Sequence, residues 1–406
     1  MEPLEVALTE YVRTLVNREA ITSASVECAF RKVRRHRFLE GWYHPDVRDG
    51  RVVFLPVEYD RDRPTAENIK EIYSNQALVT AVNLSMPTSS TSQPSLVAGM
   101  LELSDLRRGM RVLEIGTGTG YNAALLAEIL GSAADVFTIE FQEDVARKAG
   151  DYLADEGYSD VKVICGDGFF GVPEAAPFDR IVATVGCSDL SVHWLDQLDE
   201  AGFLLIPLQH GLSDPLVRLW RDPDSPTQAV GHIVDTSGFM RIQGVLTWAT
   251  PWRNSLIVGL PERPTWSRRL PEALTSSEES GHPLGEPHHR AFAFFLSLAL
   301  RPLWYTNSGY GLADPGTSSV VVVTREAIEG YTAISSGKGL ETLYESLLGL
   351  LDLWSDLAAP TPSDFELQFI PKSGLDLSKR LEGTPGRRWI IERPFFWEFA
   401  LLPEEI

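Results

Sequence analysis

The sequence predicts an α/β fold with a mostly parallel sheet covered by helices on both faces, followed by a C-terminal α+β module. Three observations indicate this: short apolar runs alternate with helical stretches from about Leu106, a glycine-rich turn follows the first run, and the alternation ends near Pro251. Strands that alternate with helices at this spacing usually pair in parallel. Because 406 residues exceed a typical single domain, we expect a catalytic domain and a second module.

Residues 3–40 are expected to form a helical cap. Apolar residues recur there at helical spacing, at Val6, Val12, Leu15 and Val16. The stretch ends in a basic run from Arg31 to Arg37. Such a run could bind an acidic peptide or a phosphate, but it is more often a solvated helix end stabilised by the helix dipole, which is what we expect here.

The alternating region predicts the strands of the main sheet. In chain order they are RVLEI, DVFTIE, VKVIC, FDRIVAT and GFLLIPL, with the helical stretch YNAALLAEIL after the first. The expected first domain, with its cap, therefore covers residues 1–245. Cys187 and Asp189 follow the fourth strand, where a structural role is the expectation.

The second module is expected over residues 246–406. Residues 261–290 are rich in Pro, Ser and Glu without any period, as in an exposed connector. The module holds seven of the ten tryptophans, which excludes a disordered tail. A helical apolar stripe is predicted at Leu340, Leu343, Leu347, Leu350 and Trp354. Three strands are predicted, at Val320–Thr324, Phe365–Ile370 and Trp389–Glu392. We expect an accessory domain for substrate recognition.

Charge and cysteine content exclude several classes of protein. The formal net charge of -20 would repel a phosphate backbone, so nucleic acid is not an expected partner. Cys28, Cys165 and Cys187 are too few and too scattered for a disulfide framework or a thiolate metal site. No metal is expected at the connector histidines either, His282, His288 and His289, because they lack acid or thiol companions. The acidic N-terminus and the short apolar stretch Ala291–Leu300 predict a soluble, cytoplasmic protein without a membrane partner.

The glycine-rich segment Glu114-Ile115-Gly116-Thr117-Gly118-Thr119-Gly120 predicts a ligand site. It lies between an apolar strand and a helix, where glycines allow a sharp turn and a close approach of the backbone to a ligand. The helix N-terminus adds unpaired N–H groups. A nucleotide-like ligand fits this arrangement, although the spacing G-x-G-x-G differs from the dinucleotide fingerprint G-x-G-x-x-G.

Two acidic residues strengthen the prediction of a nucleoside site. Glu140 ends the second strand, about 20 residues beyond the loop, where an acid accepts hydrogen bonds from both ribose hydroxyls. Asp167 follows the third strand, where its carboxylate would meet an adenine amine. An open α/β sheet binds ligands at these carboxyl ends of its strands.

The same segments resemble the protein-L-isoaspartate O-methyltransferase family. VLEIGTGTGYNAALLA, the IE that ends the second strand, GDGFFGVPEAAPFDRIVAT and QLDEAGFLLIPL are similar to that family over most of residues 27–245. AFRKVRRHRFL resembles its V-x-R-x-x-F segment, and Thr91-Ser92-Gln93-Pro94 its substrate segment T-[IS]-S-x-P. The resemblance implies the Rossmann-like sheet of class I methyltransferases and S-adenosylmethionine as the cofactor. The implied cofactor site contains Glu114, Gly116, Thr117, Gly118, Gly120, Glu140, Asp167 and Gly168.

By the same resemblance, Ser92 lies at the reacting carboxylate. A carboxylate is nucleophilic at neutral pH, so aligning it with the methyl donor is most of the catalysis required, and Ser92 would orient it by a hydrogen bond. The alternative for Ser92 or Gln93 is a cap of the helix that begins at Pro94. The family commonly has an acid at the position of Asn75, so a charge-dependent role of that position is in doubt.

The segments around residues 73–80 and 87–94 resemble a subgroup of the family associated with ATP-grasp peptide (graspetide) maturation. Members of that subgroup methylate an aspartate of a ribosomally made, macrocyclised peptide, and the ester collapses to an aspartimide. We expect this activity, with the C-terminal module as the extension typical of the subgroup. The alternatives are a repair methyltransferase for isoaspartate in proteins, and a non-catalytic peptide-binding module on a methyltransferase fold.

Overall fold

The structure is a computed structural model. It describes residues 3–48, 51–84, 86–210, 214–247, 266–269, 287–298, 303–306, 309–314, 319–326, 330–336, 339–373 and 387–403. The chain divides into two compact units. The first contains Met1–Cys187, Ser191–Pro207 and Gly238–Leu246, and the second contains Ser188–Leu190, Leu208–Ser237 and Thr247–Ile406.

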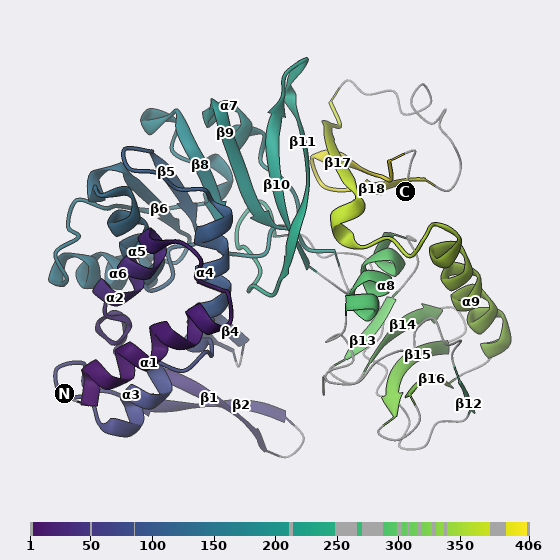
Figure 1. Cartoon of the computed structure of the whole chain (residues 1–406), viewed down its shortest axis with the longest axis horizontal. Helices are drawn as coiled ribbons and strands as arrows, with labels where there is room; N and C mark the ends of the chain where they lie inside the picture. The colour runs from purple at the N-terminus through teal and green to yellow at the C-terminus, as the bar shows by residue number, and fades with distance from the viewer. Residues whose placement is uncertain are drawn as a thin grey trace. The chain divides into compact units, whose positions relative to one another are not determined.

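Parallel strands form the centre of the first unit (Figure 1). They are β5 (Val112–Ile115), β6 (Val136–Glu140), β7 (Lys162–Cys165), β8 (Phe178–Ala183) and β9 (Leu198–Pro207). Their order is β7-β6-β5-β8-β9, and each neighbouring pair is parallel, which confirms the strands expected from the apolar runs. Because β6 and β8 flank β5, the winding of the chain reverses beside β5, where open α/β sheets bind their ligands.

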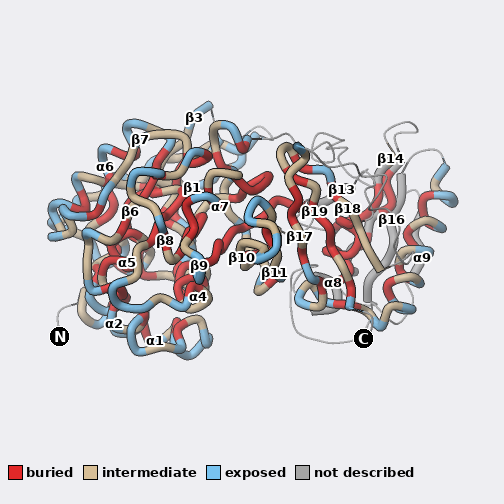
Figure 2. The backbone as a smooth tube through the Cα atoms, turned by 90° about the horizontal axis from the view of Figure 1, so that it is seen from above, coloured by how far each residue is buried: buried red, intermediate tan, exposed pale blue. Residues whose placement is uncertain are grey.

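Helices connect and cover these strands. They are α4 (Pro94–Leu103), α5 (Tyr121–Leu130), α6 (Glu143–Asp155) and α7 (Val192–Gln197). Helix α5 packs against β6, and α6 packs against β6 and β7. Every residue of β5 is buried, as expected for a strand covered on both faces. Figure 2 shows the buried backbone concentrated in the central strands and exposed residues on the outer turns of the helices.

The N-terminal cap contains the expected helices and also a sheet that the sequence did not indicate. Helices α1 (Pro3–Asn17) and α2 (Ala24–Lys32) lie within the expected residues 3–40, whereas α3 (Ala66–Ile72) was not predicted. The strands are β1 (Gly41–Arg48), β2 (Arg51–Glu58), β3 (Leu78–Asn83) and β4 (Met86–Thr91). They form two antiparallel hairpins in the order β2-β1-β3-β4, and β4 leads directly into the expected substrate segment.

The second unit contains two antiparallel sheets and two described helices. One sheet has the order β18-β19-β17-β11-β10, with β10 (Asp214–Asp222), β11 (Ser225–Ser237), β17 (Glu366–Pro371), β18 (Arg388–Glu392) and β19 (Phe396–Leu401). The other has the order β12-β16-β15-β14-β13, with β12 (Trp266–Arg269), β13 (Leu303–Thr306), β14 (Gly309–Asp314), β15 (Ser319–Glu326) and β16 (Gly330–Ser336). The helices are α8 (Pro287–Leu298) and α9 (Leu340–Asp356).

Several expectations for the C-terminal half can be compared with these elements. Helix α9 buries Leu343, Leu347 and Trp354 of the expected stripe. The three expected strands correspond to β15, β17 and β18. Strands β10 and β11 were expected within residues 1–245, but they belong to the second unit, because β11 pairs with β17 from Ala229 to His232. Most of the expected connector, with His282, lies outside the described residues. In the part of the chain that the structure describes, no helix is long and apolar enough to span a membrane.

Candidate active site

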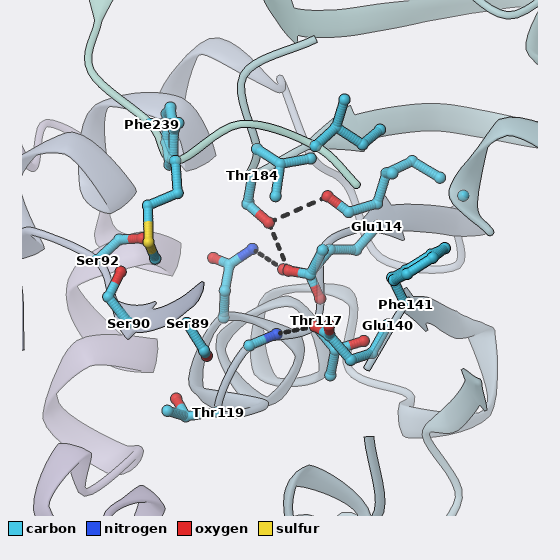
Figure 3. A pocket seen from close by; sticks show the side chains of 18 of the residues that line it. Ser89, Ser90, Ser92, Glu114, Thr117, Thr119, Glu140, Phe141, Thr184 and Phe239 are labelled. Carbon is cyan, nitrogen blue, oxygen red and sulfur yellow. Dashed lines mark hydrogen bonds between the residues drawn. The ribbon is translucent and has the colours of Figure 1, made fainter. Parts of the chain in front are cut away.

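A hollow of about 880 Å³, open to solvent, lies at the carboxyl ends of β5, β6 and β8. Its walls come from the end of β4, the glycine loop, the end of β6, the residues after β8 and a segment after β11, namely residues 88–92, 114–119, 121–122, 139–142, 184–185 and 239–243, together with Val97 and Gly168. In Figure 3, Ser90, Ser92 and Phe239 lie on one side of this pocket, and Glu140 and Phe141 lie on the other.

The glycine loop turns tightly between β5 and α5. The N–H groups of Gly116 and Thr117 both donate to the carbonyl oxygen of Ile139, at 2.9 and 3.1 Å, which ties the loop to β6. Gly116 has a φ of 103°, and a Cβ there would lie 2.7 Å from a methyl carbon of Val185. A side chain at this position would therefore be strained and would collide with the wall of the pocket.

Glu140 is held by backbone N–H groups and faces the pocket. Its Oε2 accepts from the N–H of Gly118 at 3.0 Å, and its Oε1 accepts from the N–H of Gln142 at 3.1 Å. Burial raises the pKa of Glu140, and these backbone hydrogen bonds act in the opposite direction. Each carboxylate oxygen can accept more than one hydrogen bond, which fits a carboxylate that also accepts from the hydroxyls of a ribose.

Glu114 is the most deeply buried acid of the pocket, with 0% of its surface exposed. Its Oε1 accepts from the Asn122 amide, and its Oε2 accepts from the Thr138 hydroxyl, both at 2.7 Å. Burial raises the pKa of Glu114 to about 7, although these two hydrogen bonds act to lower it. The carboxyl group is thus fixed in place and poised to change protonation near neutral pH.

The structure brings most of the expected site residues together. The lining includes Ser92, Glu114, Gly116, Thr117, Gly118, Glu140 and Gly168. Gly120 and Asp167 are not part of it. Gly120 instead starts α5 with a φ of 80°, and a Cβ there would meet Leu153 of α6 at 3.2 Å. Its role in the structure is the close packing of two helices.

Asp167 is bonded to backbone N–H groups outside the pocket. Its Oδ1 accepts from the N–H of Phe169 at 2.9 Å, and its Oδ2 accepts from the N–H of Val245 at 2.8 Å. Gly244 makes this possible, because a Cβ there would lie only 2.2 Å from Oδ2. Asp167 thereby anchors the chain that follows β11, and its expected contact with adenine stays a prediction.

The segment from Phe239 to Gln243 is a wall of the pocket that the sequence did not indicate. Gly186 donates its N–H to the carbonyl of Met240 at 2.7 Å and accepts from the N–H of Ile242 at 3.0 Å. These bonds hold the segment beside the loop after β8. Its sequence has neither strand alternation nor a motif. Only the flanking glycines, Gly238 and Gly244, indicate an irregular backbone conformation.

Ser92 lies in the pocket, and the alternative that it caps helix α4 is wrong. The N-cap residue of α4 is Gln93, which makes no side-chain cap hydrogen bond. Asn75 performs this role from a distance, because its Oδ1 accepts from the N–H of Ser95 at 2.9 Å. A carbonyl oxygen suffices for this contact, so the asparagine that departs from the family pattern has a structural use.

Arg35 fixes the backbone of the Ser92 segment. The expectation of a solvated helix end is wrong for this residue, whose side chain is 0% exposed. Its guanidinium donates to the carbonyl oxygen of Ser92 at 3.0 Å. It also donates to the carbonyl oxygens of Ile72, Ser74, Gln76 and Thr91, at 2.6 to 3.4 Å. One buried cation therefore joins the substrate segment to the turn after α3.

Asp189 and Cys187 have structural positions, as expected. Asp189 is buried within the second unit, where its Oδ2 accepts from the N–H groups of Phe395 and Phe396 at 2.6 and 3.2 Å. Burial raises its pKa to about 7, partly offset by the Arg393 guanidinium. Cys187 is fully buried in the first unit and does not line the pocket. Among the residues that the structure describes, no cluster of His, Cys, Asp and Glu could hold a metal ion.

Comparisons with known proteins agree on one family. The family model for protein-L-isoaspartate(D-aspartate) O-methyltransferase matches residues 8–232. Protein-L-isoaspartate O-methyltransferase 1 of Nitrosospira multiformis is 38% identical over 213 residues, which are 51% of this chain and 76% of that protein. The protein-L-isoaspartate O-methyltransferase of Opitutus terrae is 44% identical over 128 residues, which are 32% of this chain and 54% of that protein.

A solved structure supports the fold. A protein-L-isoaspartate O-methyltransferase superposes with a TM-score of 0.50 and 23% sequence identity, over 89% of this chain and 96% of that one.

Proposed function

Because the chain belongs to the protein-L-isoaspartate O-methyltransferase family, we propose that it repairs proteins by methylating the free carboxylate of their L-isoaspartyl residues. The chain is an enzyme with the class I methyltransferase fold, and it depends on S-adenosylmethionine. One observation supports the acceptor chemistry above others: Ser92, free of any capping role, lines the same pocket as Glu140 and the glycine loop.

The residues of the pocket fit this cofactor. The carboxylate of Glu140 would accept from the ribose hydroxyls, and Gly116 and Gly118 leave room for the ligand beside the backbone. When bound, S-adenosylmethionine supplies a methyl group on a positively charged sulfur, which is already strongly electrophilic. The protein therefore needs to provide alignment and exclusion of water rather than chemical activation.

The acceptor carboxylate also needs no activation. An ordinary carboxyl group is ionised at neutral pH, so no base has to remove a proton before the oxygen attacks the methyl carbon. The Ser92 hydroxyl would donate a hydrogen bond to one carboxylate oxygen and leave the other directed at the methyl group. Arg35, through the Ser92 carbonyl, keeps this hydroxyl in position.

Ser92→Ala should lower kcat by about tenfold or more, because one orienting hydrogen bond of roughly 1.5–3 kcal/mol to a charged acceptor is lost. The affinity for S-adenosylmethionine and the melting temperature should change little. Steady-state methyl transfer, calorimetric titration and thermal unfolding measure the three quantities. Equal turnover per folded molecule would remove Ser92 from the acceptor site.

Asn75→Ala is the matched control for this variant. It removes the cap of α4 without changing a residue that lines the pocket, so it should lower the free energy of unfolding by about 1 kcal/mol. Turnover of the folded fraction should survive. The two variants thus separate orientation of the acceptor from stability of the helix behind it.

A second candidate substrate is an ordinary aspartate in a ribosomally made, macrocyclised peptide. The size of the second unit supports it, since the 174 residues that follow the matched range 8–232 suggest selection of a particular partner. Methylation would convert a poor leaving group into methoxide, and a neighbouring amide nitrogen could then close an aspartimide with loss of methanol. A macrocycle that holds the amide near the ester would accelerate this closure.

Mass spectrometry with two sets of substrates distinguishes the candidates. The repair function predicts efficient methylation of diverse linear isoaspartyl peptides and little methylation of the same peptides with ordinary aspartate. The alternative predicts that a cyclised aspartyl precursor is preferred and loses methanol after methylation. If linear isoaspartyl peptides are not methylated by a protein that binds the cofactor, the proposed repair function is wrong.

A further inference from the structure

A second hollow adjoins the cofactor pocket within the first unit. It has a volume of about 1,100 Å³, part of which is open solvent, and is lined by residues of β1, β2, β3 and α6. Ser89, Gly118 and Thr119 line both hollows. The second hollow is therefore a groove that continues outward from the cofactor pocket, and we call it the hairpin groove.

The two N-terminal hairpins create the groove by diverging. Strands β1 and β2 pair along their whole length, from Gly41 with Glu58 to Arg48 with Arg51. Strands β1 and β3, in contrast, are paired at one described position, Tyr43 with Val79. Among the described residues β1 and β3 pair nowhere else, and residues of α6 line the hollow together with both hairpins.

The groove has an apolar floor. Trp42 from β1 and Val145 and Tyr152 from α6 line it, and they are 1%, 8% and 5% exposed. Val57 and Val82 contribute apolar walls from the two hairpins. Such a floor can bind the aliphatic stem of a long side chain while its charged end stays at the rim.

Two buried hydroxyls at the junction with the cofactor pocket have unused hydrogen-bonding capacity. Thr119 is 8% exposed, and its hydroxyl forms no hydrogen bond with the described residues. Ser89 is 5% exposed and accepts from the Thr80 hydroxyl at 3.1 Å, which leaves its own proton free to donate. Both hydroxyls line the two hollows and can donate to a polar ligand such as a peptide backbone.

The rim carries an excess of negative charge. Glu40 is paired with Lys148, at 3.2 Å between its Oε2 and the ammonium nitrogen. Glu58 and Asp144 also line the groove, and neither forms an ion pair with any described residue. Three carboxylates against one ammonium leave a local charge of -2, which would attract a cation.

We propose that the hairpin groove binds the polypeptide segment next to the methylated residue and prefers a lysine or arginine there. The inference rests on the proposed function in that the acceptor is a polypeptide entering the adjoining pocket. The stem of the basic residue lies on the apolar floor, its charged end pairs with Glu58 and Asp144, and Ser89 and Thr119 donate to the backbone of the segment.

The test uses fluorescently labelled linear isoaspartyl peptides with the full-length protein and S-adenosylhomocysteine. A single Lys is placed in turn at each of the three positions on either side of the isoaspartate, with Gln peptides as the reference. At one or two positions Lys should tighten Kd by about fivefold, and the gain should shrink at high salt. Fluorescence polarisation measures Kd without requiring methyl transfer.

Charge variants identify the groove as the source of the preference. Glu58→Gln/Asp144→Asn should abolish the gain from Lys, whereas Glu67→Gln/Asp160→Asn, which removes two exposed charges elsewhere, should retain it. Glu58→Lys/Asp144→Lys should favour Glu over Lys at the same position. Calorimetric titration of S-adenosylmethionine should give an unchanged Kd for every variant, which shows that each is folded.

The outcomes separate this inference from the proposed function. Methylation of all isoaspartyl peptides without a preference for Lys, or a preference that persists in Glu58→Gln/Asp144→Asn, overturns the groove and leaves the repair function intact. Binding of Lys peptides through Glu58 and Asp144 without methylation supports the groove and overturns the repair function. Failure of every peptide to bind overturns both.

Discussion

Glu140→Ala should weaken S-adenosylmethionine binding by about a hundredfold or more. The carboxylate lines the pocket, and hydrogen bonds to a charged group contribute roughly 1.5–3 kcal/mol each. Two such bonds to the ribose hydroxyls account for at least a factor of a hundred in Kd. Calorimetric titration measures the affinity directly.

Two controls are needed because Glu140 also holds Gly118 and Gln142. Glu140→Gln keeps one acceptor oxygen of similar shape, so its affinity should fall between those of the wild type and Glu140→Ala. Glu143→Ala removes an exposed acid three residues further along and should bind the cofactor normally. An unchanged Kd in a folded Glu140→Ala protein would exclude Glu140 from the cofactor site.

Glu114→Gln should remove a pH dependence of stability from the cofactor-free enzyme. Burial raises the pKa of Glu114 from 4.5 to about 7 in the folded chain. A carboxyl group with a raised pKa stabilises the fold fully below its unfolded pKa, and this contribution is lost as the pH rises through the folded value. Between pH 5 and pH 8 the wild type should therefore lose about 2–3 kcal/mol relative to Glu114→Gln.

Urea unfolding at four pH values between 5 and 8 checks this expectation. Glu143→Gln, which changes an exposed acid, should follow the wild-type curve. The free energy of unfolding of Glu114→Gln, relative to that of the wild type, should be lower at pH 5 than at pH 8. At pH 5 the wild-type carboxyl group is protonated and stabilises the fold. Parallel curves for the wild type and Glu114→Gln would show that the buried carboxyl does not titrate in this range.

Secondary structure and the glycine loop were predictable because their signals are local. A continuous apolar run specifies a buried parallel strand, and strands β5, β6, β7, β8 and β9 all lie where such runs occur. Gly116 and Gly118 follow β5 directly, and Glu140 ends β6, so adjacency in a parallel sheet was enough to place them in one pocket. The prediction that Ser92 belongs to the site depended on the resemblance of its segment to the family.

Gly120 and Asp167 show where local reasoning stopped. Both belong to the motifs of the expected site, but their neighbours come from elsewhere in the chain. Gly120 packs against Leu153 of α6, and Asp167 accepts from Val245, 78 residues further along. A motif gives the position of such residues along the chain. The residues that contact them are determined by the tertiary fold.

The sequence by itself determined the family, the parallel sheet, the glycine loop and the acid at the end of β6, because these depend on short-range pattern. Only the tertiary structure decided that Arg35 is buried beneath the Ser92 segment, that residues 239–243 wall the pocket, and that diverging hairpins leave a groove beside it. The physical reason is that a buried cation or an irregular wall is stabilised by carbonyl and N–H groups far away in the sequence. Neither the periodicity nor the local composition of the sequence indicates those partners.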